Sequence, residues 1–348
     1  MFKPKFTISN KINKALTQIE RSRGFLDAAR LTEDWLAFMQ KKALILEAHH
    51  TTHIEGTHLS LEQSKKLLEG KKVSKVNPDD KQELLNYKTA FEFVSTYLQE
   101  KKPITEGLVR QIHSILVQNV RGNSAMPGEY RKVQNFVVNS KTHEIIYTPP
   151  PAYDVPIMMK ELVEWLENEK EIHPILISGI IQFQFVHIHP FLDGNGRTAR
   201  LLSTLYLYKT GYDFKRLFTI SEYYDRERQK YYLAIQSVRE NNLDMTKWLE
   251  YFCLGLTTQL KELQHSTESK IKLDLFCNEK KLSENQKKAL ELALEGPFTL
   301  QDFMDVCPTI SKRTLQRELS RLQELDMIES FGATAKRTYH LKDFVNEQ

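Results

Sequence analysis

Apolar residues recur at helical spacing along most of this chain, and capping residues mark where the predicted helices begin. The clearest helix covers residues 32–55, with Thr32 as its N-cap and Gly56 as its stop. Its apolar face consists of Leu36, Met39, Ala43 and Leu46. Further helices are predicted at residues 60–70, 82–100 and 105–119.

The pattern changes after Pro127. Residues 133–138 and 144–147 are short apolar runs on either side of a polar turn at 139–142, which predicts a β-hairpin. Open hairpin edges can pair with extended peptides, although an ordinary hairpin packed on the helices is equally compatible with the sequence. The apolar run 175–188 is ambiguous between a buried strand and a buried helix.

Beyond residue 282 the sequence predicts a second, smaller unit of three capped helices and a β-ribbon. The predicted caps are Ser283, Thr299 and Ser311, and residues 327–332 can pair with 337–341. Three helices followed by a ribbon are typical of a winged helix-turn-helix. We therefore expect such a domain at the C-terminal end of the sequence.

Arginines on the third helix of this unit form a basic stripe. Arg313, Arg317 and Arg321 recur every four residues, opposite an apolar face formed by Leu315, Leu319 and Leu322. Lys336 and Arg337 lie at the ribbon. The stripe favours DNA contact, but residues 280–348 carry 11 Lys and Arg against 11 Asp and Glu, without the surplus usual in phosphate binders. DNA binding and a protein-docking or homodimerisation role both stay open.

Composition indicates an ordinary soluble protein of two or three domains. The 348 residues include 49 Lys and Arg and 45 Asp and Glu, and this surplus of +4 is too small to indicate nucleic-acid binding by itself. Cys253, Cys277 and Cys307 show no CxxC spacing, so neither a disulfide framework nor a zinc site is indicated. Because no apolar leader or run of about 18 apolar residues occurs, we expect a cytoplasmic protein without a membrane segment.

The densest chemistry lies in residues 189–200, which read His-Pro-Phe-Leu-Asp-Gly-Asn-Gly-Arg-Thr-Ala-Arg. Gly194, Asn195 and Gly196 can turn successive N–H groups inward just before a predicted helix. Such a turn at a helix N-terminus binds anions, because the free N–H groups and the helix dipole both favour negative charge.

Charged and titratable side chains surround this turn. Arg197 and Arg200 are three residues apart on the predicted helix, and two guanidinium groups there suit a polyphosphate. Asp193 can hold a divalent cation against phosphate oxygens. His189, whose ordinary pKa lies near neutrality, can act as a general base.

This stretch matches the HPFx(D/E)GNGRxxR signature residue for residue, so the chain resembles the Fic-domain proteins. The resemblance implies a mainly α-helical core with a β-hairpin flap, and transfer of AMP from ATP to a Ser, Thr or Tyr hydroxyl. In that reaction His189 is the base, Asp193 holds Mg²⁺, the glycine turn cradles the phosphates, and Arg197 and Arg200 neutralise them. The resemblance also makes 175–188 a helix and 133–147 the flap on which a target protein docks.

Two further candidates enter through the same resemblance. Gln184, five residues before His189, is expected to approach the pocket, and Tyr231 is expected to contact the adenine by stacking or by its edge. A polar interruption of a core helix and an aromatic core position are the alternatives for these two residues.

Residues 51–56, Thr-Thr-His-Ile-Glu-Gly, match the (S/T)xxxE(G/N) inhibitory motif of Fic proteins. Thr51 and Glu55 are four residues apart and share a helix face. In the resembling class the inhibitory helix is N-terminal and intramolecular, and its glutamate pairs with the second signature arginine. We therefore expect Glu55 to pair with Arg200, in a bidentate contact that blocks the γ-phosphate position.

The predicted organisation is mainly α. It comprises an N-terminal region (1–84) with the inhibitory helix, a Fic domain (85–255), a helical connector (256–282) and a winged helix-turn-helix (283–348). The predicted function is self-restrained protein AMPylation with ATP and Mg²⁺. Two alternatives remain, namely AMP removal driven by Glu55, and a DNA-binding regulator in which the Fic site senses a nucleotide. The target, the oligomeric state and the signal that releases Glu55 are left open.

Overall fold

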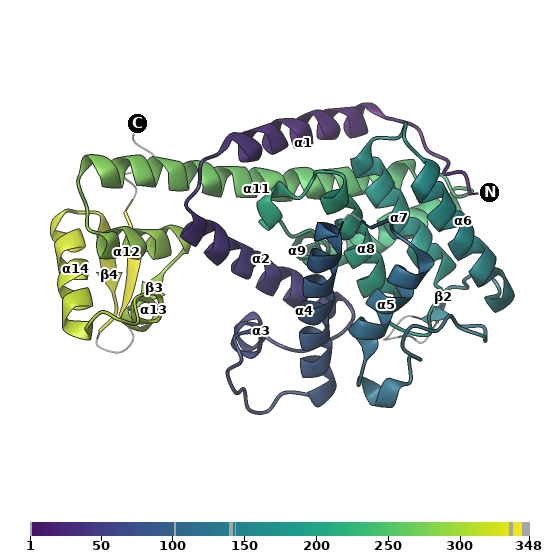
Figure 1. Cartoon of the computed structure of the whole chain (residues 1–348), viewed down its shortest axis with the longest axis horizontal. Helices are drawn as coiled ribbons and strands as arrows, with labels where there is room; N and C mark the ends of the chain where they lie inside the picture. Colours follow the sequence, from purple (N-terminus) through teal and green to yellow (C-terminus); the bar gives the residue numbers. More distant parts are fainter. Residues whose placement is uncertain (1, 101, 139–141, 143, 334–336, 343–348) are drawn as a thin grey trace. The chain divides into compact units, whose positions relative to one another are not determined.

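The computed structural model describes residues 2–100, 102–138, 142, 144–333 and 337–342. The chain divides into two compact units, residues 1–261 and 262–348, and both contain helices (Figure 1). The division lies within one long helix, α11 (Thr246–Glu279). It therefore falls inside the segment 256–282 that the sequence analysis treats as a connector.

The first unit is built mainly from helices. In chain order they are α1 (Asn10–Ala28), α2 (Glu33–Ile54), α3 (Leu61–Leu68), α4 (Pro78–Gln99), α5 (Glu106–Val117), α6 (Val155–Asn168), α7 (Pro174–Ile188), α8 (Asn195–Lys209), α9 (Ser221–Arg226), α10 (Arg228–Glu240) and the first part of α11. Short 3-10 turns lie at η1 (Arg121–Asn123), η2 (Ala152–Asp154) and η3 (Phe214–Arg216). As predicted, Thr32 caps α2. The start of α4 precedes the predicted one because Asn77 caps it by accepting the N–H of Asp79 at 2.8 Å.

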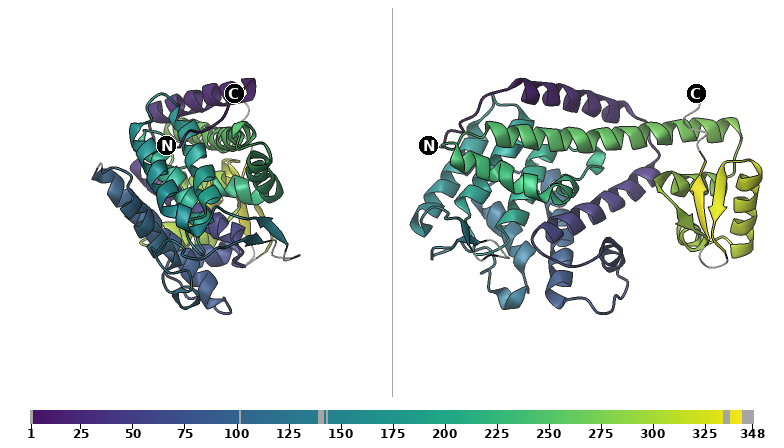
Figure 2. Two further views of the ribbon diagram at one scale, coloured as in Figure 1. Left: turned by 90° about the vertical axis from the view of Figure 1, so that its right-hand side faces the viewer. Right: turned by 180° about the vertical axis from the view of Figure 1, so that it is seen from behind.

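Helices α7 and α8 form the centre of the first unit (Figures 1 and 2). The ambiguous run 175–188 is helical, and α7 is buried along almost its whole length. It packs along α8, and α8 also contacts α2, α4 and α5. On another side of α7, Gly179 permits close packing against α11, because a Cβ at this position would lie 2.8 Å from Leu249 Cδ2. The signature motif thus connects two helices held by the core.

The predicted hairpin is present in a shorter form. Its strands are β1 (Val137–Val138) and β2 (Ile145–Tyr147), paired antiparallel with an irregular register between Val137 and Val138. Residue 135 lies outside the ladder, and its side-chain amide donates to the carbonyl of Phe191 at 3.0 Å. Most of the predicted turn, residues 139–141, lies outside the described residues.

The second unit packs helices against a small antiparallel sheet. After α11 it contains α12 (Glu284–Glu295), β3 (Phe298–Thr299), α13 (Leu300–Val306), α14 (Lys312–Glu324), β4 (Ile328–Phe331) and β5 (Thr338–Leu341). The strand order is β3-β5-β4. Ser283, Thr299 and Ser311 all cap helices as predicted. The two-residue strand β3 was missed because so short a segment shows no alternation, and Lys336 lies outside the described residues.

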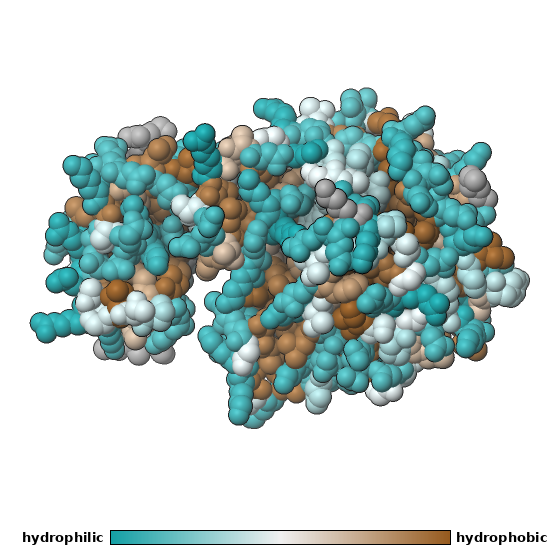
Figure 3. Space-filling model, in the orientation of Figure 1, coloured by the Kyte–Doolittle hydropathy of each residue, from teal (hydrophilic) through white to brown (hydrophobic). Residues whose placement is uncertain are grey.

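Polar side chains cover most of the face drawn in Figure 3, with apolar patches between them. Helix α7 is rich in apolar residues but has only 15 residues, whereas a membrane crossing needs about 20. Within the described part of the chain, no helix combines the length and the apolar character that a membrane span requires.

Candidate functional site

The signature motif spans the end of α7, a tight loop and the start of α8. His189 is the C-cap residue of α7 in a left-handed conformation, with φ 52° and ψ 58°, and its N–H donates to Phe185 O at 2.9 Å. A non-glycine residue in this region costs of order 1 kcal/mol, which the surrounding structure must supply. Such strain at a histidine is typical of a functional position.

Buried side chains hold the loop backbone in place. Arg131 donates from Nε to the carbonyl of His189 at 2.9 Å, and its backbone N–H donates to Pro190 O at 2.9 Å. Asn195 brackets Phe191, accepting its N–H at 2.9 Å and donating to its carbonyl at 2.8 Å. The Asn195 side chain thus shapes the loop, while the sequence predicts nucleotide binding by the backbone N–H groups of this turn.

His113, on α5, contacts the motif loop and was not identified in the sequence analysis. Its Nδ1 accepts the N–H of Gly128 at 3.0 Å, so Nε2 carries the proton and donates to Asp193 O at 3.0 Å. The ring stacks on Phe191 with 3.6 Å between centroids. Burial lowers the pKa of His113 to about 4, so the ring is neutral near pH 7.

The glycine turn lies at the N-terminus of α8, where the sequence predicts that an anion binds. Gly194 is the N-cap residue at φ 74°, and a Cβ there would lie 2.6 Å from Val117 Cγ1. A Cβ at Gly196 would lie 2.1 Å from Oε1 of Glu55. The carboxylate of Glu55 therefore lies over the helix end where an anion would bind.

Glu55 and Arg200 are in contact, as expected, but through one carboxylate oxygen. Arg200 Nη2 lies 2.6 Å from Glu55 Oε1, and the expected bidentate geometry is absent from this pair. The same Nη2 also donates to the carbonyl of Thr51 at 3.0 Å, and Nε donates to its Oγ1 at 2.8 Å. Arg200 is buried, so α2 holds this arginine by three separate contacts.

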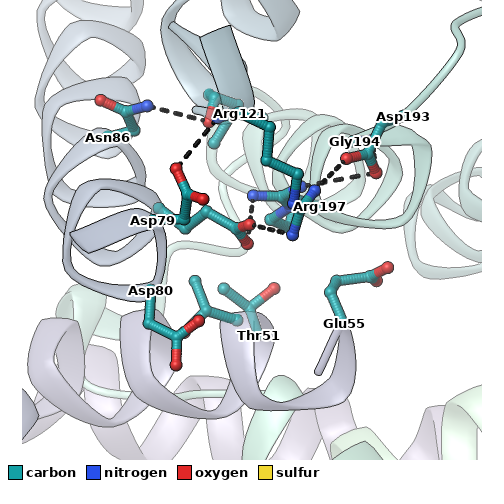
Figure 4. A network of polar contacts seen from close by, with 12 residues as sticks. Thr51, Glu55, Asp79, Asp80, Asn86, Arg121, Asp193, Gly194 and Arg197 are labelled. Atoms are coloured by element: carbon teal, nitrogen blue, oxygen red, sulfur yellow. Dashed lines mark hydrogen bonds and ion pairs between the residues drawn. The ribbon is translucent and has the colours of Figure 1, made fainter. Parts of the chain in front are cut away.

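Arg197 is also buried and already has an internal partner. Its Nη1 lies 2.7 Å from Oε2 of Glu83, and Nη2 lies 3.7 Å from Oδ1 of Asp193. Arg121 contacts both of these carboxylates (Figure 4). The sequence analysis found Arg197 and Asp193 but missed Glu83 and Arg121, which come from α4 and η1.

Asp193 has the properties of a ligand for a hard cation. The N–H of Gly194 donates to its Oδ1 at 2.6 Å. Although burial raises the pKa of Asp193, the Arg197 guanidinium and this N–H hold it below its ordinary value, so the carboxylate is ionised near pH 7. Among the described residues, no three His, Cys, Asp or Glu side chains are grouped to hold a metal. The site fits Mg²⁺ that arrives with phosphate oxygens, rather than a metal held by protein ligands alone.

Comparison with known proteins identifies the central region. Residues 103–207 match the Fic/DOC family model. The chain resembles the Fic/DOC family in this segment. It is 29% identical over 202 residues to Protein adenylyltransferase Fic of Drosophila willistoni, covering 57% of this chain and 39% of the relative. The match to the Culex quinquefasciatus protein of the same name is 29% over 234 residues, covering 66% and 44%. The chain thus spans about two fifths of the length of these curated relatives.

Solved structures share the fold. A Fic family protein from Desulfovibrio desulfuricans G20 superposes with a TM-score of 0.68 at 24% identity, covering 98% of this chain and 99% of that one. Fic-1 from C. elegans superposes with a TM-score of 0.60 at 25% identity, covering 72% and 71%. The mainly helical fold with a small hairpin is therefore the Fic fold.

His189 lies in the segment that matches this family model, and its imidazole is neutral near pH 7. Its pKa is lowered to about 4, chiefly by burial and in smaller part by Arg239 and Arg131, while the carbonyl of Val186 and the charge of Glu55 act in the opposite direction. The Nδ1 atom lies 3.4 Å from Val186 O, a long hydrogen bond that places the ring proton on Nδ1. Nε2 is then left to accept a proton.

The structure places the two candidate nucleotide contacts in the core. Tyr231 is 2% exposed, and its hydroxyl lies 3.4 Å from Nε2 of Gln182. Gln184 is also buried on α7, two residues further along. The neighbouring Tyr232 is half exposed, and its hydroxyl lies 3.5 Å from the carbonyl of Ile54, directly before Glu55. Sequence spacing alone could not separate these adjacent tyrosines.

Arg239 on α10 links the hairpin to the segment before the motif loop and was not assigned from sequence. Its guanidinium lies 3.4 Å from the ring centroid of Tyr147 in β2. Its Nη2 lies 3.4 Å from Val186 O, the same carbonyl that faces Nδ1 of His189. Among the described residues its buried Nε has no hydrogen-bond partner.

Proposed function

We propose that this chain is a protein adenylyltransferase that moves AMP from ATP to a hydroxyl of a target protein or of itself, under restraint by Glu55. The observation that carries the proposal is the carboxylate of Glu55 over the α8 N-terminus, in contact with Arg200. An internal carboxylate there occupies a position suited to a phosphate group. The relatives named Protein adenylyltransferase Fic support the same reaction.

The reaction follows from the arrangement of His189 and the α8 turn. The target hydroxyl oxygen forms a bond to the α-phosphorus of ATP, and the bond from that phosphorus to the bridging oxygen breaks. Pyrophosphate leaves with the bonding electrons, and the hydroxyl proton passes to Nε2 of His189. Mg²⁺ held by Asp193 would offset charge on the phosphates. The protein contributes mainly position and electrostatics, as is usual in phosphoryl chemistry.

Other residues of the motif then divide the binding of ATP. The N–H groups of the turn at Gly194 and Gly196 face the phosphates, and Arg200 binds the outermost one once Glu55 has left. Arg197 remains paired with Glu83, which holds its guanidinium beside the turn. We place the adenine contact at Tyr232 in preference to Tyr231, because Tyr232 has an exposed ring. Gln184 stays a prediction.

A single contact is strong enough to act as a brake. One charge-assisted hydrogen bond contributes about 1.5–3 kcal/mol. Holding the population of the active arrangement at ~1% requires a free-energy difference of about 2.7 kcal/mol. This is half of the free energy that shifts a two-state equilibrium from 1:99 to 99:1. The Glu55 side chain is 26% exposed, so water screens part of the attraction. The contacts of Thr51 compensate by fixing Arg200 in the orientation that meets Glu55.

The flap supplies the proposed docking edge for the target protein. Val138, Ile145 and Ile146 are apolar, belong to the paired strands and are largely exposed. An extended segment of the target can add to this edge through its backbone while these side chains cover it. Its hydroxyl would then lie beside His189.

AMP removal is the second candidate, and the same glutamate favours it. Only Oε1 of Glu55 contacts Arg200, so the partly exposed carboxylate can also orient a water molecule toward a phosphodiester. Release of AMP from a modified target, lost in Glu55→Gln, would identify this reaction.

A DNA-binding regulator with a nucleotide-sensing site is the third candidate. Arg313, Arg317 and Arg321 are exposed on α14 and lie opposite its buried leucines. This arrangement supports the interpretation of residues 283–348 as a winged helix-turn-helix that docks on DNA.

Labelled nucleotides separate the transferase from its rivals. We would incubate the Glu55→Gly variant with ATP labelled at the α- or at the γ-phosphate, with and without cell lysate. Protein label from α-labelled ATP only supports AMP transfer. Label from γ-labelled ATP would indicate phosphate transfer, and label from neither would reject both reactions.

A further inference from the structure

Four charged side chains beside the α8 N-terminus form a closed ring of alternating sign (Figure 4). Glu83 contacts Arg121 and Arg197, each at 2.7 Å. Asp193 contacts Arg121 at 2.7 Å and Arg197 at 3.7 Å. Each carboxylate therefore lies between two guanidinium groups. Arg121 contacts Asp193, the carboxylate that is proposed to hold Mg²⁺.

The loop that presents Arg121 has an unusual backbone. Left-handed φ angles of 46° to 64° occur at Asn119, Arg121, Gly122 and Asn123. Helix α4 holds this loop, because Asp79 accepts the N–H of Arg121 at 3.0 Å and Asn86 donates to the carbonyl of Gln118 at 2.8 Å. Backbone strain maintained in this way is common where a side chain must be placed accurately.

One face of α4 positions both ends of Arg121. Asp79, Glu83 and Asn86 are four and three residues apart, so they lie on the same side of the helix. Asp79 fixes the backbone of Arg121, and Glu83 binds its guanidinium. Helix α4, which is separate from the motif loop, therefore holds the guanidinium of Arg121 next to Asp193.

Exposure distinguishes the fixed side of the ring from the side that can open. The side chains of Glu83 and Arg197 are 1% and 2% exposed, whereas those of Asp193 and Arg121 are 43% and 50% exposed. Breaking the buried pair would leave a charge without a partner in a medium of low dielectric. The exposed Arg121–Asp193 pair exchanges with water and ions at little cost.

We propose that Arg121 is an internal counter-cation for Asp193, which a divalent cation arriving with the nucleotide displaces while Arg121 stays paired with Glu83. This inference rests on the proposed nucleotide-binding function, because that function assigns the cation to Asp193. A guanidinium and a divalent cation repel each other and cannot share one face of a carboxylate. Arg121 is thus a positioning residue that holds Asp193 ready and raises the cation concentration that nucleotide binding requires.

The experiment compares ATP affinity with and without Mg²⁺, by calorimetry in excess Mg²⁺ and in EDTA. The dissociation constant in EDTA divided by that in excess Mg²⁺ measures the coupling between cation and nucleotide. All proteins carry Glu55→Gly, so that the brake does not mask binding. Arg121→Ala and Arg121→Gln should each raise the ratio about fivefold, the value of one exposed ion pair. Lys81→Ala, which removes an exposed cation from the same helix, should leave it unchanged.

An unchanged or smaller ratio in both Arg121 variants would overturn the inference. Absence of ATP binding in the Glu55→Gly protein would overturn it too, because no cation would then be delivered to Asp193. Label transfer measured in parallel keeps the two proposals apart. A raised ratio without label transfer would contradict the transferase proposal and support the inference about Arg121. Label transfer with an unchanged ratio would support the transferase proposal and contradict the inference.

A measurement without nucleotide tests the ring contact itself. The effects of Arg121→Gln and Asp193→Asn on the midpoint of thermal unfolding should be less than additive in the double variant, because either change alone already opens the same contact. Additive effects would show that the two side chains do not interact in solution, and the inference would fail.

Discussion

The carboxylate of Glu55 lies 2.6 Å from the guanidinium of Arg200, although 145 residues separate them in the sequence. Glu55 is the C-cap residue of α2, and Arg200 belongs to the second turn of α8. Arg228 holds the end of α2 by donating to the carbonyl of His53 at 2.8 Å. Whatever shifts the end of α2 therefore also changes access to the anion-binding turn.

Glu55 should weaken ATP binding by competition. Glu55→Gln removes the negative charge with little change of shape and should tighten binding about tenfold, and Glu55→Gly should tighten it by up to about a hundredfold. Calorimetric titration with ATP and Mg²⁺ measures both. Glu62→Gln, on the exposed side of α3, serves as the control. Equal affinity in all proteins would show that Glu55 does not occupy the nucleotide site.

His189 should give the reaction a broad pH plateau. Because its pKa is about 4, the ring is already neutral at pH 6, and kcat/KM of Glu55→Gly should stay level from about pH 8 to about pH 6. Arg239→Gln removes a positive neighbour that lowers this pKa, so the fall in rate should begin at a higher pH. Lys230→Gln, an exposed change on the same helix, should not move the profile. A profile unaffected by Arg239→Gln would contradict this electrostatic account.

Buried neutral histidines should make the fold sensitive to acid. The pKa values of His49, His113, His187 and His189 are lowered to about 4 from an ordinary 6.5, chiefly by burial. Between these values the unfolded chain binds more protons than the folded one, so the free energy of unfolding falls as the pH drops from 6.5 to 4. Each residue contributes roughly 1 kcal/mol to this loss at about pH 5.5.

Urea unfolding at about pH 7.5 and about pH 5.5 measures that loss. His187→Gln should reduce the difference between the two conditions, while His58→Gln, at an exposed position, should preserve it. An unaltered difference in His187→Gln would remove His187 from the explanation.

The basic stripe on α14 should bind duplex DNA in a salt-dependent manner if the winged-helix interpretation holds. Changing Arg313 and Arg317 together to Ala should reduce the magnitude of the slope of log affinity against log salt concentration by about two, one for each phosphate contact. Fluorescence anisotropy with a labelled duplex at several salt concentrations measures the slope. Failure of the wild-type chain to bind at low salt would leave a protein-docking or dimerisation role for this unit.

Local patterns predicted much of the fold because their causes are local. Thr32, Ser283, Thr299 and Ser311 cap helices within three residues of themselves, and the spacing of Leu315, Leu319 and Leu322 marks a buried face. The signature motif likewise gathers its residues in one short segment, from the end of α7 to the second turn of α8. The contact of Glu55 with Arg200 was predicted from the resemblance to the inhibitory motif, whose glutamate pairs with the second signature arginine.

Residues that act from a distance gave no such signal. Glu83, His113, Arg131 and Arg239 reach the loop from separate helices and segments, and their neighbours in sequence resemble those of ordinary surface or core positions. Whether Tyr231 or Tyr232 turns outward depends on the rotation of α10 against the core, which the aromatic pair alone does not determine. The paired length of the hairpin was overestimated, because β1 contains only Val137 and Val138, and the Asn135 side chain binds the motif loop.

The most direct test of the account is transfer of label from α-labelled ATP to protein by the wild type, Glu55→Gly, and Glu55→Gly combined with His189→Ala. We expect weak labelling in the wild type, labelling about 10- to 100-fold stronger in the single variant, and none above background in the double variant. That pattern would establish both the base and the brake. Equal labelling in the single and double variants, or none in any of the three with target-containing lysate present, would contradict the account.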